Sequence, residues 1–222
     1  MDTKDGGTLA AASLSQSGDT LVLRVFDYDG VHAVWRPRGS PIKRYGMSFF
    51  SFSLALSNDG QVVALGDWAI SSPAVTVQAF EWTGYDWIQR GRNITSLFGP
   101  VSVALSRDGR RLALSVRSPG VTQVFQWESE DWVQLGQDMA GGSAVAMDGT
   151  GQRIVIGNSL SDNVLVQDYV DEVWSLSSLQ NGKSGSLFGF SVSMSQNGTT
   201  LAIGAPLDNA GGDSSGRVVV LT

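Results

Sequence analysis

Few residues in this 222-residue chain could carry out catalysis. The sequence holds one histidine and no cysteine, so the common pairings of a nucleophile with a histidine base are nearly excluded. A histidine metal site would lack a second ligand of its own type, and a thiolate site is impossible. We expect His32, which lies close to Asp29, to be a solvated turn residue. The absence of cysteine leaves the redox compartment open.

Paired carboxylates are the remaining catalytic option, since glycosidases place two Asp or Glu side chains on either side of a sugar bond. Asp148 is the best candidate because it replaces a serine that recurs at the equivalent places in the chain, and Asp67 is the candidate second acid. Asp is also common in turns, where its side chain bonds the backbone, and Asp148 precedes Gly149. The turn interpretation is favoured, and a glycoside hydrolase is kept as the alternative function.

Two less repetitive loops supply the candidate binding residues. The first, residues 67–73, carries Asp67 and Trp68, and the second is long, polar and glycine-rich and carries Asp208 and Asp213. Both loops should connect the second strand of a unit to its third, so they should open on one face, where binding usually resides. We therefore expect these four residues to contact a protein or glycan. The other interpretation is a partly buried Trp68 and a loop that is merely flexible.

A repeated hairpin must position these residues. In residues 102–115, Val103 and Leu105 alternate with small side chains, which indicates a strand, and Asp108-Gly109 supplies a tight turn before a second strand. Similar hairpins recur, and their turn glycines are separated by 42, 49, 42 and 47 residues: Gly18, Gly60, Gly109, Gly151 and Gly198. These intervals match one four-stranded blade of a β-propeller.

Aromatic residues follow the hairpins at a constant spacing. A third and a fourth strand should meet at the pairs Trp82 with Trp87, Trp127 with Trp132, and Tyr169 with Trp174. A row of sugar-binding pockets is one interpretation. A structural one is better, because large rings on the outer strands would fill the wedge between blades that splay from a common axis.

The sequence therefore predicts an all-β fold, a β-propeller of about five blades built from four-stranded antiparallel units. The chain should form a single domain, 1–222, with units at about 1–45, 46–96, 97–138, 139–185 and 186–222. The first unit is short between its turn glycine and its tryptophan, so residues 20–26 should form one continuous strand. Nothing obvious supplies a fourth strand for the last unit, so both end units should be incomplete. An open ring would expose strand edges that favour self-association.

The last unit contains Phe188-Gly189, then Gly204-Ala205-Pro206, and residues 97–99 and 50–51 hold a second and a looser Phe-Gly element. This pattern resembles the FG-GAP repeat of integrin-α-like propellers. The resemblance implies a propeller that binds other macromolecules. The calcium loops of that family are missing here, because the corresponding turns are too short and carry too few carboxylates to surround the ion. We expect no metal and no cofactor.

The net charge of −6 disfavours nucleic acid and anionic membranes as partners, because both are held mainly by Lys and Arg. The sequence shows neither a signal-peptide core at its start nor an apolar stretch of bilayer length. The compartment stays open: a cytosolic protein and a segment of a longer, secreted chain both fit. The preferred function is a non-enzymatic recognition module that meets a protein or a glycan through loops on one face.

Overall fold

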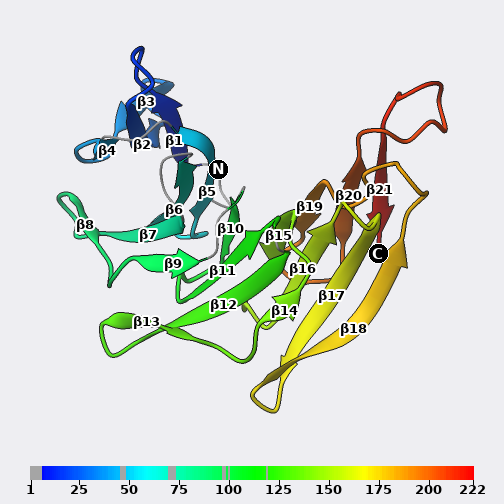
Figure 1. Ribbon diagram of the computed structural model, residues 1–222. Coiled ribbons are helices and arrows are strands. Elements are labelled where there is room, and N and C mark those ends of the chain that lie inside the picture. The colour runs from blue at the N-terminus through cyan, green and yellow to red at the C-terminus, as the bar shows by residue number, and fades with distance from the viewer. Residues whose placement is uncertain (1–6, 46–48, 70–73, 97–98, 100, 119) are drawn as a thin grey trace.

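The computed structural model describes residues 7–45, 49–69, 74–96, 99, 101–118 and 120–222. Within these ranges the regular structure consists of strands, which pair antiparallel in five sheets, named here A to E in chain order. The sheets follow one another along an open arc, with the N-terminal and C-terminal sheets at its two ends (Figure 1). None of the described residues form a helix that could cross a membrane.

Sheet A contains β1 (Thr8–Leu14), β2 (Thr20–Asp29), β3 (Val34–Pro37) and β4 (Ile42–Tyr45). Sheet B contains β5 (Phe49–Leu56), β6 (Val62–Ala69), β7 (Val75–Trp82), β8 (Trp87–Gln89) and β9 (Ile94–Ser96). Sheet C contains β10 (Val101–Leu105), β11 (Arg111–Val116), β12 (Val121–Glu128), β13 (Asp131–Gln134) and β14 (Met139–Ala140). Sheet D contains β15 (Ala144–Met147), β16 (Arg153–Asn158), β17 (Asn163–Val170) and β18 (Val173–Asn181). Sheet E contains β19 (Ser191–Met194), β20 (Leu201–Ala205) and β21 (Arg217–Leu221).

The three middle sheets are four strands wide. In sheets B and C the third strand carries two short strands on its outer edge, β8 and β9 on β7, and β13 and β14 on β12. In sheet D the single strand β18 takes that place, with a change of register opposite Val166 and Gln167. Sheet E stops at its third strand, and in sheet A the continuous β2 pairs directly with β3 and β4. The prediction of incomplete first and last units is confirmed.

The turn between the first and second strands explains why the chain repeats a serine. The Ser57 hydroxyl donates to Asp59 Oδ1 at 2.6 Å and accepts the Val62 N–H at 2.9 Å. Ser15, Ser106 and Ser195 also accept the N–H five residues on, and they donate to Asp19, Asp108 and Asn197. Neighbouring turns are also joined by backbone bonds, from the N–H of Asn58 to the Arg107 carbonyl and from the N–H of Arg107 to the Gly149 carbonyl, both 2.9 Å. The turns therefore share one face of the arc, the turn face. The second strands end on the opposite face, the loop face.

The core lies between the sheets. Each neighbouring pair shares one cluster of buried side chains, with Leu23 and Leu65 between sheets A and B and Val77 and Leu114 between sheets B and C. Ile156 belongs to the third cluster, between sheets C and D, and a fourth cluster with Val164 and Ile203 lies between sheets D and E. Because every sheet depends on its neighbours for burial, stability should arise from the interfaces between sheets.

The repeated tryptophans also join neighbouring sheets. The indole N–H groups of Trp87, Trp132 and Trp174 donate to backbone carbonyls of the preceding sheet at 2.8, 2.9 and 2.8 Å. The three side chains are 4–9% exposed. Gly91 of sheet B, next to Arg90, packs against the Trp127 and Trp132 rings of sheet C. Its φ is +74°, and a Trp127 ring carbon lies 2.8 Å from where a Cβ would be, so a larger residue does not fit there. The structural interpretation of these aromatic residues is confirmed.

Candidate binding site at the axis of the arc

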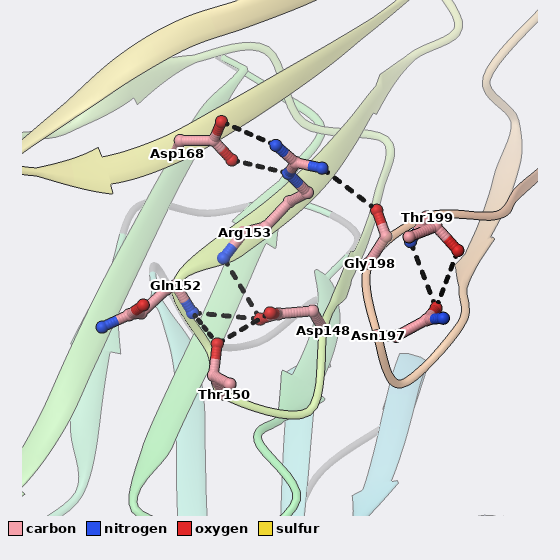
Figure 2. A network of polar contacts seen from close by, with 8 residues as sticks. All are labelled: Asp148, Thr150, Gln152, Arg153, Asp168, Asn197, Gly198 and Thr199. Carbon is pink, nitrogen blue, oxygen red and sulfur yellow. Dashed lines mark hydrogen bonds and ion pairs between the residues drawn. The ribbon is translucent and has the colours of Figure 1, made fainter. Parts of the chain in front are cut away.

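Asp148, the predicted catalytic acid, holds a turn together. Its Oδ1 accepts the N–H groups of Gln152 and Arg153 at 3.0 and 3.1 Å, and its Oδ2 accepts the Thr150 hydroxyl at 2.7 Å (Figure 2). The side chain is only 8% exposed. Asp148 therefore accepts the N–H five residues on, as the serine does in the other turns, and also the N–H four residues on, which Asp59 and Asp108 accept in theirs.

The cation beside Asp148 braces two sheets. Arg153 on β16 forms a two-pronged ion pair with Asp168 on β17, with N···O distances of 2.7 and 2.9 Å, and its remaining nitrogen donates to the Gly198 carbonyl of sheet E (Figure 2). Hydrogen bonding from Arg153 lowers the pKa of the Asp168 carboxyl. Arg111 reaches the Gly151 carbonyl of sheet D in the same manner, at 3.0 Å. Because the arrangement is repeated between sheets, it has a structural explanation.

Asp67, the predicted second acid, lies at the other end of its sheet. Its carboxyl is 2% exposed and pairs with Arg44 on β4, with N···O distances of 3.0 and 3.4 Å. Burial raises the pKa of the Asp67 carboxyl, and the Arg44 guanidinium opposes that rise. Asp67 stands at the loop-face end of β6 in sheet B, whereas Asp148 lies on the turn face in sheet D. The structure does not bring the two predicted acids together.

The predicted binding residues share the loop face, but most are engaged with the protein. The sequence predicts a loop from Asp67 onward, whereas β6 continues to Ala69 and Trp68 is partly buried against the core between sheets B and C. Residues 70–73 of that loop lie outside the described residues, as do Leu97 and Phe98 of the second Phe-Gly element. Asp208 is 6% exposed and its Oδ1 accepts the Ala210 N–H at 2.8 Å. Asp213 is exposed.

A cavity of about 390 Å³ opens where the first strands of sheets B to E converge. These strands line the concave side of the arc (Figure 1). The lining comes from the loop-face ends of β5, β10 and β15, from the start of β19, and from one residue beyond β11: Ser51, Phe52, Ser53, Val101, Ser102, Val103, Arg117, Ser143, Ala144, Val145, Phe190, Ser191 and Val192. We call it the axial cavity.

The axial cavity combines hydroxyl groups, aromatic rings and one cation. The Ser53 and Ser102 oxygens accept the N–H groups of Val103 and Val145 at 3.1 and 3.2 Å, and no described group accepts their hydroxyl hydrogens. Both hydroxyls can therefore donate to a ligand. Phe52 and Phe190 are 40% and 48% exposed, more than the other phenylalanines whose burial is described. Ser53 and Ser102 each lie four residues before a turn serine, and Phe52 and Phe190 each lie five residues before one. The repeat therefore marks these positions, although they were not among the predicted binding residues.

Asp162 anchors the Phe-Gly element of sheet E. Its carboxylate accepts the N–H groups of Gly185 and Phe188 at 2.7 and 3.1 Å. Partial burial would raise the pKa of this carboxyl, but these donors outweigh it and the pKa lies below the ordinary value. In the described part of the chain, no group of three or more His, Cys, Asp or Glu side chains could hold a metal ion.

The sheets and their common axis define an incomplete β-propeller, and solved structures support this class. The chain is 13% identical to a functionally unknown protein from Desulfotomaculum acetoxidans, with a TM-score of 0.61 over 86% of this chain and 61% of the other. It is 14% identical to the periplasmic gluconolactonase of Pseudomonas aeruginosa, with a TM-score of 0.64 over 98% and 69%. For the Dos1 propeller the values are 15% and 0.60, over 88% and 48%. The chain thus spans about half to two thirds of the length of these proteins.

A comparison of the sequence with known protein families assigns the C-terminal part of the chain to a type of propeller repeat. Residues 178–221 match the FG-GAP repeat. The resemblance noted in the last unit is therefore confirmed, and the chain is a propeller module that carries an FG-GAP repeat. No curated protein matches the sequence.

Proposed function

We propose that this propeller module is a non-enzymatic recognition protein that binds a glycan in the axial cavity. The observation that carries the proposal is the pairing of two exposed phenylalanine rings, Phe52 and Phe190, with the serine hydroxyls around them. A sugar presents an apolar face of C–H groups that packs on aromatic rings, and an edge of hydroxyls that needs hydrogen-bonding partners. Ligand sites typically combine apolar walls with a few placed polar groups in this way.

The size of the axial cavity favours a glycan over a protein partner. Stable protein interfaces bury about 800 Å² on each side and are spread over many residues. A cavity of about 390 Å³ instead falls in the range of sites for small molecules and short oligosaccharides. A glycoprotein could also be the partner, with its attached glycan as the part that enters the cavity.

Catalysis has less support than binding. The gluconolactonase of P. aeruginosa is an enzyme by name, but at 14% identity the likeness concerns the fold alone. The described lining of the axial cavity offers no Asp, Glu or His as a general acid or base. A glycoside hydrolase would need Asp148, whose carboxylate already bonds the backbone of its own turn.

The test is binding to a panel of neutral and acidic oligosaccharides, measured by calorimetry and by immobilised-glycan capture. Phe190→Ala should weaken binding at least tenfold without changing the far-UV spectrum, because the ring is about half exposed. Tyr85→Ala is the matched control, since Tyr85 is 88% exposed in the turn between β7 and β8, and it should bind normally. No binding to any glycan, or binding that survives both Phe52→Ala and Phe190→Ala, would contradict the proposal.

A further inference from the structure

Arg117 differs from the other partly buried cations of this protein. The five other arginines that are not fully exposed all have hydrogen bonds or ion pairs within the protein: Arg38, Arg44, Arg90, Arg111 and Arg153. Arg117 is also partly buried, but among the described residues its side chain has no hydrogen-bond or ion-pair partner. Arg117 lines the axial cavity. A charge that is partly removed from water without a partner is unfavourable, so a ligand of opposite charge that enters the site gains binding free energy from pairing with it.

The surroundings of Arg117 also favour an anionic ligand. The described lining of the cavity contains no carboxylate that could neutralise the guanidinium. The Ser53 and Ser102 oxygens each already accept one backbone N–H, and no described group accepts their hydroxyl hydrogens, so both hydroxyls are available to donate to a ligand. Donors and a cation together are complementary to an oxygen anion.

We propose that the axial cavity binds an acidic sugar, with the carboxylate of a uronic acid on Arg117 and the serine donors and the sugar ring on the phenylalanine side. This inference rests on the proposed function and specifies the class of its ligand. A planar carboxylate suits a single guanidinium, which can hold both oxygens through parallel N–H bonds. A phosphate shares the anionic oxygens but lacks the ring that Phe52 and Phe190 would contact.

The experiment compares oligogalacturonate and glucuronate oligosaccharides with their methyl esters, so that only the charge of the carboxyl group changes. The wild-type protein should bind the free acids at least tenfold more tightly than the esters, and added NaCl should reduce that preference. Arg117→Gln should abolish the preference while leaving binding of the esters intact. Arg107→Gln is the matched control, because Arg107 is an exposed arginine on the turn face, and it should behave as the wild type.

The outcomes separate this inference from the proposed function. Equal binding of acid and ester by the wild type would overturn the acidic-sugar assignment and leave glycan binding standing. Loss of the preference in Arg107→Gln, or its retention in Arg117→Gln, would also overturn the assignment. Inorganic phosphate that competes as strongly as the uronates would point to a general oxyanion site and contradict a sugar acid. Failure to bind any glycan would refute the proposed function itself.

Discussion

Replacement of Trp132 tests whether the repeated tryptophans hold neighbouring sheets together. The side chain is 8% exposed, its indole N–H donates to the Arg90 carbonyl at 2.9 Å, and its ring centroid lies 5.3 Å from that of Trp127. Truncation of a buried tryptophan costs about 3–5 kcal/mol of unfolding free energy. Trp132→Phe keeps much of the ring but leaves the Arg90 carbonyl without its donor, so it should cost about 1–3 kcal/mol.

Trp35 provides the matched control for Trp132. It has the same place in the first unit and pairs with Tyr28 at 5.2 Å, as Trp132 pairs with Trp127. However, no described sheet precedes sheet A, and Trp35 is 43% exposed. Trp35→Ala therefore loses mainly the contact with one neighbouring ring, which is worth about 0.5–1.5 kcal/mol.

The assay is urea unfolding followed by far-UV circular dichroism, whose signal comes mainly from the backbone, with each variant normalised to its own folded and unfolded baselines. The urea midpoints of two variants are compared only where their m-values agree. A chain of stacked units can unfold in more than one step, and a changed m-value would reveal this. The expected order of stability is wild type, Trp35→Ala, Trp132→Phe and then Trp132→Ala. If Trp132→Ala loses no more stability than Trp35→Ala, the indole bridge between sheets does not stabilise the fold and the reasoning is wrong.

Three further predictions concern the acidic residues. Because the folded-state pKa of Asp162 is lowered from 3.8, its carboxylate stabilises the protein above that pH and the benefit fades as the pH falls. Asp162→Ala should therefore lower the melting temperature more at pH 7 than at pH 3. Asp67 has a raised folded-state pKa, so its charge costs stability above pH 3.8. Arg44→Ala should cost about 3–5 kcal/mol at pH 7 and less at pH 4, whereas Asp67→Asn should be much milder, as thermal melts at both values would show. Millimolar calcium should leave the melting temperature unchanged, and an upward shift would reveal a site in the loop that holds Asp208 and Asp213.

The sequence predicts the longer strands well because their signals are local. Alternation and turn chemistry place a third strand at residues 75–82 and another near 121–127, and the structure has β7 and β12 there. The short strands β4, β9 and β14 were not foreseen. Each has two to four residues and is defined by pairing with the outer edge of a strand already formed, which no local pattern encodes.

The roles of the predicted acids depended on partners that are distant in sequence. Asp67 looks like a free acid at the end of a strand, but Arg44 lies 23 residues earlier in another sheet and neutralises it. Asp148 looks like a departure from a serine pattern, yet its carboxylate accepts the Arg153 N–H in the serine's place and the Gln152 N–H as well. In both positions the residue type alone is ambiguous, and the neighbours decide.

The repeat nevertheless contains the signal that leads to the axial cavity. Counting eleven residues from each turn serine leads to the loop-face end of the second strand or to the residue just past it. Trp68 holds this position near the end of β6, Arg117 follows β11 and Pro206 follows β20. At repeated positions one physical requirement recurs in every sheet, so one type of residue recurs as well. At this position the residue changes from unit to unit because the loop face imposes no common packing requirement on it. The reasoning that selects Trp68 from the sequence therefore selects Arg117 equally, and the structure separates them: Trp68 packs on the core, whereas Arg117 lines the cavity without a partner among the described residues.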